Sequence, residues 1–240
     1  IVVTEIGIYI LSKLLRPLNA DAFIVETEDV ANRLSVLVQK KCYVVSNTYN
    51  QYFEKVDYTT KEDNAAFKLL YVCTPYDHKN ISIIPSVVNL LLKNGINDVN
   101  FVLTISNQDY DRLIPQFARK YVKTVGVVSP SLLPDLYKDC DAVFVPSLIE
   151  CFTANYPEAM VSRRPILTSD LSFAHSICYD AAVYFNPLDA DDILNKILLV
   201  KNNRTLQEDL VVKGLKELTK FDTAASRGDK YIKILQDFLN

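Results

Sequence analysis

Short apolar runs alternate with amphipathic stretches along most of the chain. The runs predict strands buried on both faces of a parallel sheet, and apolar residues three or four positions apart predict helices. The alternation therefore predicts an α/β fold, a Rossmann-like parallel sheet with helices on both faces. Strands are expected at residues 22–26, 42–46, 67–72, 99–105, 124–127, 142–145, 165–168 and 183–185. Helices are expected at residues 1–17, 28–39, 81–93, 108–121, 132–138, 172–178, 190–200, 206–220 and 225–239, and one capped by Asn155 or Tyr156.

The segment 140–170 carries the candidate chemistry, because it predicts strand, loop, helix and strand in turn. Glu150 lies in the loop and Glu158 in the first helical turn, at an edge of the sheet where ligands of open α/β proteins bind. Carboxylates accept hydrogen bonds from sugar hydroxyls, and backbone N–H groups suit a diphosphate. A sugar nucleotide needs both kinds of partner. The spacing alone leaves open that Glu150 is a solvated loop acid and Glu158 only a partner of the helix dipole. The backbone N–H groups expected to line the site belong to Cys151, Phe152, Thr153 and Ala154.

A second candidate group follows the first strand of the main sheet, in the loop CTPYDHKN, residues 73–80. Lys79 begins a predicted helix there, where a lysine can reach a phosphate as a point charge. Taken alone, such a lysine is more often solvated. Lys79 is thus a candidate for phosphate binding that needs support from the rest of the chain.

The stretch PSLIECFTANYPEAM resembles the E-x7-E segment of family 4 (group 1) glycosyltransferases of GT-B architecture. The resemblance implies a retaining enzyme whose C-terminal Rossmann-like domain binds the donor. It also implies that Glu150 faces the transferred sugar and Glu158 the ribose. The loop CTPYDHKN is similar to the family's G-R-x-x-x-x-K-N loop, whose lysine touches the donor diphosphate. Lys79 matches, whereas Cys73 and Thr74 replace the glycine and arginine, so Thr74 is the candidate donor contact at that position.

Two further features follow from the resemblance. Cys151 and Thr153 stand where family members carry glycine; a side chain resists positive φ by about 1–2 kcal/mol, and the Thr153 hydroxyl is expected to compensate as a donor. The stretch TVGVVSPSLLPDLYKDCD is similar to the family's segment beside the nucleotide base, and a plain strand end and turn is an equal alternative there. The candidate residues for the wall of the base site are Val127, Val128 and Ser129.

The resemblance spans about residues 20–220 and implies a domain division. Residues 1–47 correspond to the end of an N-terminal acceptor domain, 48–64 to a polar linker or hinge, 65–220 to the donor-binding domain and 221–240 to a C-terminal helix. The chain begins at Ile1 rather than at methionine, which suggests that it starts inside a longer protein. We therefore expect this chain to bind donor without transferring sugar by itself.

Composition excludes several functions. The net charge of −3 and scattered lysines argue against nucleic acid as a partner. Five cysteines without a C-x-x-C pair, beside only two histidines, indicate reduced thiols in a cytoplasmic protein and no metal site. No cofactor is expected, since G-x-G-x-x-G and G-K-[ST] are both missing. Arg163 and Arg164 are expected to be solvated, with acidic lipid at the inner membrane face as a weaker alternative.

The resemblance implies a glycosyltransferase that transfers a sugar from a UDP- or GDP-sugar to a glycan or lipid-linked acceptor with retention. Lys79 and Glu150 are the candidate catalytic residues. Two alternatives stay open: a degenerate, non-catalytic module of the same fold, favoured by the missing arginine and glycines, and a sugar-nucleotide epimerase, which would need further histidines and acids.

Overall fold

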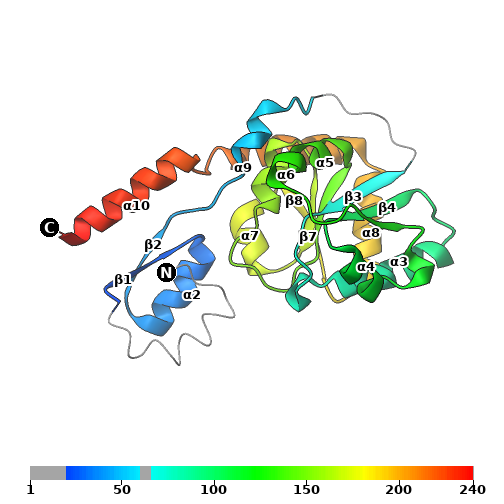
Figure 1. The fold of residues 1–240 in the computed structure, drawn as a ribbon, viewed down its shortest axis with the longest axis horizontal. Coiled ribbons are helices and arrows are strands. Elements are labelled where there is room, and N and C mark those ends of the chain that lie inside the picture. Colours follow the sequence, from blue (N-terminus) through cyan, green and yellow to red (C-terminus); the bar gives the residue numbers. More distant parts are fainter. Residues whose placement is uncertain (1–19, 60–65, 240) are drawn as a thin grey trace.

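A six-stranded parallel sheet forms the centre of the computed structural model, which describes residues 20–59 and 66–239 (Figure 1). The strand order is β5-β4-β3-β6-β7-β8, and every neighbouring pair is parallel. The expected α/β fold is confirmed. Because β4 and β5 lie to one side of β3 while β6 to β8 lie to the other, the order reverses between β3 and β6. The strands are β3 (Phe67–Tyr71), β4 (Val99–Leu103), β5 (Val122–Thr124), β6 (Ala142–Val145), β7 (Ile166–Ser169) and β8 (Ala182–Phe185).

Helices cover both faces of the sheet, with α3 packed on α8 and α6 packed on α9 (Figure 1). The helix predicted at residues 1–17 lies outside the described residues. The α-helices of the main sheet and C-terminus are α3 (Ile84–Lys93), α4 (Asn107–Leu113), α5 (Leu133–Asp139), α6 (Asn155–Val161), α7 (Ser172–Cys178), α8 (Ala190–Lys201), α9 (Arg204–Leu218) and α10 (Ala224–Leu239). Short 3-10 helices are η1 (Gln51–Lys55), η2 (Asp77–Lys79), η3 (Ile81–Ile83), η4 (Gln116–Ala118) and η5 (Pro130–Leu132).

A smaller unit precedes the main sheet and has its own apolar core. It consists of β1 (Ala22–Val25), α2 (Glu28–Val38) and β2 (Lys41–Val44), and its two strands pair in parallel. Thr27 caps α2 as the sequence predicted, since its hydroxyl accepts a hydrogen bond from the Val30 N–H. The same hydroxyl donates to the Cys151 carbonyl at 3.2 Å, which ties this unit to the loop after β6.

Two element boundaries differ from the prediction near the far edge of the sheet. The helix expected at residues 108–121 ends at Leu113, because Pro115 has no N–H and forces Ile114 into an extended conformation. Strand β5 ends at Thr124 rather than running to residue 127. The Thr124 hydroxyl donates to the Ile105 carbonyl and lies 3.2 Å from that of Leu103, and Gly126 follows with φ of 76°, so the chain turns away from the sheet.

Arg164 is buried, and the expectation that it is solvated is wrong. Its guanidinium donates to the carbonyls of Tyr137 and Lys138, both at 2.8 Å, near the C-terminal end of α5. These carbonyls belong to the last turn of the helix and have no partner within it. Arg163, by contrast, is exposed and adopts a φ of 55°.

We expect Arg164→Met to lower the free energy of unfolding by about 1–3 kcal/mol, because the carbonyls of Tyr137 and Lys138 lose the guanidinium, and only the weakly donating Cys140 thiol still reaches that of Tyr137. Arg163→Met serves as the matched control and should stay within about 0.5 kcal/mol of the parent chain. Urea unfolding followed by circular dichroism measures both. Equal stability of the two variants would show that the guanidinium does not support the end of α5.

Candidate active site

The centre of the candidate site is the point where the strand order reverses, at the carboxyl ends of β3 and β6. The segment after β3 leads into η2, whose last residue is Lys79, and the loop after β6 leads to Glu150. Asn80 holds the two loops together in the left-handed conformation that asparagine tolerates, with φ of 53°. Its amide donates to the carbonyls of Pro146 at 3.2 Å and Pro187 at 2.8 Å. The segments after β3, β6 and β8 are thereby joined.

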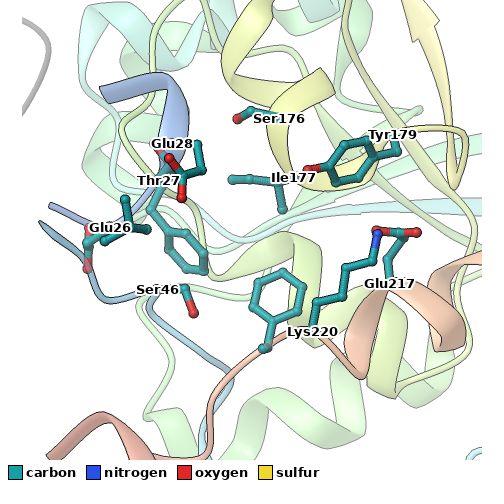
Figure 2. Close-up of a pocket in the computed structure, with 12 residues that line it drawn as sticks. Glu26, Thr27, Glu28, Ser46, Ser176, Ile177, Tyr179, Glu217 and Lys220 are labelled. Atoms are coloured by element: carbon teal, nitrogen blue, oxygen red, sulfur yellow. The ribbon is translucent and has the colours of Figure 1, made fainter. Parts of the chain in front are cut away.

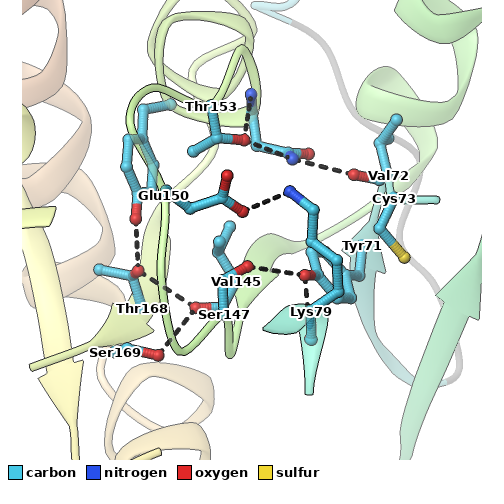
Figure 3. Close-up of polar contacts among 12 residues, drawn as sticks. Tyr71, Val72, Cys73, Lys79, Val145, Ser147, Glu150, Thr153, Thr168 and Ser169 are labelled. Carbon is cyan, nitrogen blue, oxygen red and sulfur yellow. Dashed lines mark hydrogen bonds and ion pairs between the residues drawn. The ribbon is translucent and has the colours of Figure 1, made fainter. Parts of the chain in front are cut away.

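Lys79 and Glu150 form an ion pair across this point, and Figure 3 shows the two side chains directed toward each other. Their side chains are 15% and 8% exposed, so the pair is largely removed from water. Tyr71 holds the backbone of Lys79, because its hydroxyl donates to the Lys79 carbonyl at 3.1 Å and lies 2.8 Å from the Ser147 hydroxyl. Burial raises the pKa of Tyr71 well above its usual value, so the phenol stays protonated and can keep donating.

The loop between Glu150 and α6 is held by side-chain hydrogen bonds. The Thr153 hydroxyl accepts from the Asn155 amide at 2.9 Å, and that amide also donates to the Val72 carbonyl at 2.9 Å. Ala154, with a helical backbone, occupies the N-cap position; the predicted cap at Asn155 or Tyr156 is wrong, because both lie inside the helix and are buried. In the part of the chain that the structure describes, the non-glycine residues with positive φ are Gln39, Asn80, Arg163 and Tyr179.

Cys151 and Thr153 therefore keep ordinary backbone angles, and the strain anticipated at these positions is not present. The backbone of the loop takes a path that does not need glycine. Thr153 is buried, and its hydroxyl accepts from Asn155 while it keeps its own proton, so the role of Thr153 as a donor to a ligand stays a prediction.

Glu158 lies in the first turn of α6, as predicted, and is only 6% exposed. Its Oε2 accepts a hydrogen bond from the Tyr137 hydroxyl at 2.7 Å. Burial raises the pKa of this carboxyl to about 7, and the hydrogen bond from Tyr137 opposes the rise. Because the pKa exceeds that of an unfolded glutamate, ionisation costs stability, and this part of the stability is lost as pH rises from about 4.5 through about 7.

The remaining predicted residues lie in the loop after β3 and in the turn after β5. Thr74 is exposed in the loop after β3, where its carbonyl accepts from the Tyr76 N–H at 2.8 Å. Val127 is 82% exposed and Val128 packs against the core, in the turn after β5, two strands away from β3 in the sheet. The Ser129 hydroxyl lies 3.0 Å from that of Ser131. The structure brings Lys79, Glu150 and the loop 151–154 together. Among the described residues, no side-chain hydrogen bond or ion pair joins Thr74 or residues 127–129 to them.

Sequence reasoning missed the polar side chains that support the site from the core. Tyr71 ends an apolar strand, Ser147 follows Pro146, and Tyr137 faces Asn155 and Glu158 from α5. The signal for Ser147 and Tyr71 was their position at the carboxyl ends of β6 and β3. Tyr137 gave no such signal, because its partners are distant in sequence.

A cavity of about 290 Å³ lies beside the loop, between the small unit and the ends of α7 and α9 (Figure 2). Lys220 lies 2.5 Å from Glu217 and over the Tyr179 ring, 4.5 Å from its centroid. Burial raises the pKa of Glu26, although Arg227 of α10 and a hydrogen bond with Asn47 oppose the shift. The lining residues are Glu26, Thr27, Glu28, Val44, Ser46, Phe152, Ser176, Ile177, Tyr179, Glu217, Lys220 and Phe221. The wall thus combines aromatic rings with hydroxyls and carboxylates, and includes the predicted residue Phe152.

Within residues 20–59 and 66–239, no three histidine, cysteine or acidic side chains gather as they would around a metal ion. None of the helices in those ranges has the length and apolar character needed to cross a bilayer. All five cysteines are free thiols.

Solved structures share this fold. A glycosyltransferase from Rickettsia africae superposes with a TM-score of 0.77 at 12% identity, over 96% of this chain and 67% of that one. A variant of TarM from S. aureus, crystallised with fondaparinux, alpha-GlcNAc-glycerol and UDP, gives a TM-score of 0.73 at 17% identity, over 94% of this chain and 45% of that one. These neighbours have the GT-B architecture, of which the main sheet here corresponds to one half.

Sequence comparisons agree with the fold. The O-antigen chain mannosyltransferase RfbU of Salmonella typhimurium is 27% identical over 158 residues, which make up 62% of this chain and 41% of that protein. The chain therefore spans less than half of this relative. The sequence model of one family, described as glycosyl transferases group 1, matches residues 66–203, from just before β3 to just before α9. The chain belongs to the group 1 glycosyl transferases.

Proposed function

We propose that the chain binds a UDP- or GDP-sugar at the carboxyl ends of β3 and β6, as the donor-binding part of a retaining hexosyltransferase. The observation that carries the proposal is the buried pair of Lys79 and Glu150 at the point where the strand order reverses. Open α/β sheets bind their ligands at this kind of point. A cation and a carboxylate side by side there suit a ligand whose diphosphate adjoins a sugar.

Each charged group has a role in this proposal. Lys79 turns from Glu150 to the diphosphate, while the released Glu150 accepts hydrogen bonds from hydroxyls of the sugar. Glu158 accepts from the ribose. The bond between the anomeric carbon and the phosphate oxygen breaks, and its electron pair leaves with the diphosphate. An oxygen of the acceptor bonds to the anomeric carbon, and the proton of that hydroxyl passes to the departing phosphate. Lys79 stabilises that growing negative charge, and a fixed charge in a site with little water does so efficiently. In this proposal no metal ion or cofactor supplies charge.

The cavity beside the loop is the proposed binding site for a glycan or lipid-linked acceptor. Its aromatic rings, among them Phe152 and Phe221, can cover the apolar face of a sugar, and Glu26 and Ser46 can accept from hydroxyls. The relative RfbU is named as an O-antigen chain mannosyltransferase, which is a glycan-building activity. We propose a cytoplasmic location at the inner membrane face, where lipid-linked acceptors are within reach and the exposed Arg163 can meet acidic headgroups.

Glu150→Gln tests the proposal. The substitution removes the charge that holds Lys79, so affinity for a free nucleoside diphosphate should stay equal or rise. Affinity for the whole sugar nucleotide should fall by about tenfold or more, because glutamine is a weaker acceptor for the sugar hydroxyls than the carboxylate. Hydrogen bonds to charged groups contribute ~1.5–3 kcal/mol. Isothermal titration calorimetry with both ligands measures the difference.

The matched control is Glu208→Gln, an exposed glutamate paired with Arg204 on α9, which should change neither affinity. Equal losses for the sugar nucleotide and the free diphosphate would place Glu150 at the nucleotide instead of the sugar. The competing view of a degenerate module, supported by Cys73 and Thr74 in place of a glycine and an arginine, predicts that neither ligand binds to the parent chain.

A further inference from the structure

The Tyr137 hydroxyl lies between two acceptors in the core behind the donor loop. It is 2.7 Å from Oε2 of Glu158 and 3.0 Å from Oδ1 of Asn155, and Tyr137 is completely buried. The orientation of the Asn155 amide is set by its other end, because its nitrogen lies 2.9 Å from the Val72 carbonyl, which can only accept. Oδ1 must therefore face Tyr137. A hydroxyl has a single proton to donate, so it cannot serve both acceptors at once.

The protonation of Glu158 decides which acceptor receives that proton. When Glu158 is ionised, its carboxylate can only accept, and Tyr137 donates to it, leaving Oδ1 of Asn155 without this donor. When Glu158 is neutral, its own proton goes to the Tyr137 oxygen, and Tyr137 donates to Asn155. The neutral state therefore satisfies all three groups, and the ionised state leaves a buried oxygen of Asn155 unsatisfied, which is unfavourable.

We propose that Tyr137 is a positioning residue of the donor site. When Glu158 is ionised and accepts hydrogen bonds from the hydroxyls of the donor ribose, Tyr137 turns its proton from Asn155 to Glu158. This inference rests on the proposed function, since it needs Glu158 to face a nucleotide. It adds that the strength of donor binding and the anchoring of the loop are coupled through one hydroxyl. Asn155 also holds Thr153 and Val72, so the coupling reaches the loop between Glu150 and α6 and the end of β3.

The surroundings of Glu158 make this coupling matter near neutral pH. Burial raises the pKa of the carboxyl to about 7. The titratable groups that face it are Tyr137 from α5 and Tyr58 from the segment before β3, with Arg164 beyond Tyr58. Burial raises the pKa of Tyr58 to about 12 and that of Tyr137 well above its usual value, so both phenols stay protonated. Glu158 is thus the group of this cluster that changes charge between weakly acidic and weakly alkaline solution.

The affinity for UDP or GDP, whichever the parent chain binds more tightly, is measured by calorimetry from about pH 5.5 to about pH 8.5. Affinity should rise as pH increases through about 7, because the ionised carboxylate accepts the ribose hydroxyls. Tyr137→Phe keeps the ring, which contacts Phe53 edge-on at 5.2 Å, and removes the donor. Without that donor, the midpoint of the pH profile should move up by about one unit or more.

Asn155→Ala should shift the midpoint of the pH profile in the opposite direction. Once Oδ1 is removed, the Tyr137 proton has only Glu158 left as a partner, so ionisation becomes easier and the midpoint should move down. The matched control is Tyr156→Phe, which also removes a buried hydroxyl from this region, but one paired with Thr168 at 2.7 Å rather than with Glu158. Its midpoint should equal that of the parent. The nucleotide's own titration is common to all four proteins, so only differences between proteins are interpreted.

Opposite shifts for Tyr137→Phe and Asn155→Ala, with no shift for Tyr156→Phe, would establish the shared proton. Unshifted midpoints in both variants, while the parent chain binds nucleotide, would overturn the inference and leave the proposed function standing. A parent chain that binds neither UDP nor GDP would overturn both. If Tyr137→Phe fails to fold, the direction of the Asn155→Ala shift decides alone: a downward shift supports the shared proton, and any other result contradicts it.

Discussion

Lys79→Met is expected to weaken binding of a nucleoside diphosphate by about 10- to 150-fold. A hydrogen bond between charged groups contributes about 1.5–3 kcal/mol, and the ammonium of Lys79 is the cation placed at the point where the strand order reverses. Methionine preserves the length of the side chain and its apolar packing. Removing the cation also leaves Glu150 buried and without its partner, so repulsion from the diphosphate adds to the loss.

Lys93→Met is the matched control for this substitution, because Lys93 is an exposed lysine at the end of α3. Calorimetric titration with UDP and GDP, together with circular dichroism to check folding, compares the two variants. Lys93→Met should bind like the parent chain. A folded Lys79→Met variant with unchanged affinity would show that the phosphate is held elsewhere.

Phe144→Ala should have the largest effect on stability, lowering the free energy of unfolding by about 3–5 kcal/mol. Phe144 lies on the central strand β6 and is fully buried. Its ring stacks on Phe185 with centroids 5.3 Å apart and meets Phe101 edge-on at 5.5 Å. These contacts join β4, β6 and β8 on one face of the sheet, so removal of the ring leaves a cavity lined by aromatic groups that cannot readily close.

The control for this prediction is Phe117→Ala in η4, because the Phe117 ring is 50% exposed. This substitution should lower the free energy of unfolding by well under half as much as Phe144→Ala. Urea unfolding gives both values, and the denaturant dependence of the unfolding free energy should be the same for the two variants. If Phe144→Ala were no more destabilising than Phe117→Ala, the central packing described here would be incorrect.

The sheet could be predicted from sequence because buried parallel strands carry apolar runs that are short and uninterrupted. Strand β6 was placed without error, since Asp141 and Pro146 mark its two ends. The start of the edge strand β5 was predicted two residues too late, because the apolar pair Val127 and Val128 has the pattern of a buried strand. What stops the strand is Gly126 and the Thr124 hydroxyl, and their effect depends on carbonyls of the neighbouring strand.

The site could be predicted only for the residues that a local motif marks. Glu150, Glu158 and Lys79 could be proposed because each stands at a fixed place relative to the end of a strand or the start of a helix, and their roles stay predictions. The ion pair between Lys79 and Glu150 follows from strand order, which local spacing does not encode. Tyr137 and Arg164 were missed for the same reason, since their partners lie 18 to 27 positions away in the sequence, on other elements. Arg164 even looked solvated, because a charged pair in a turn is usually exposed.

The most direct test is a calorimetric titration of the folded chain with UDP- and GDP-linked hexoses, alongside Glu158→Ala. We predict that one of the two nucleotide classes binds, and that Glu158→Ala weakens binding by about 10- to 150-fold, because the ribose loses a charged acceptor. Binding should also raise the melting temperature of the parent chain, since the ligand binds only the folded state. No binding of either class to the folded parent chain, or equal binding to Glu158→Ala, would contradict a nucleotide-sugar site at the carboxyl ends of β3 and β6.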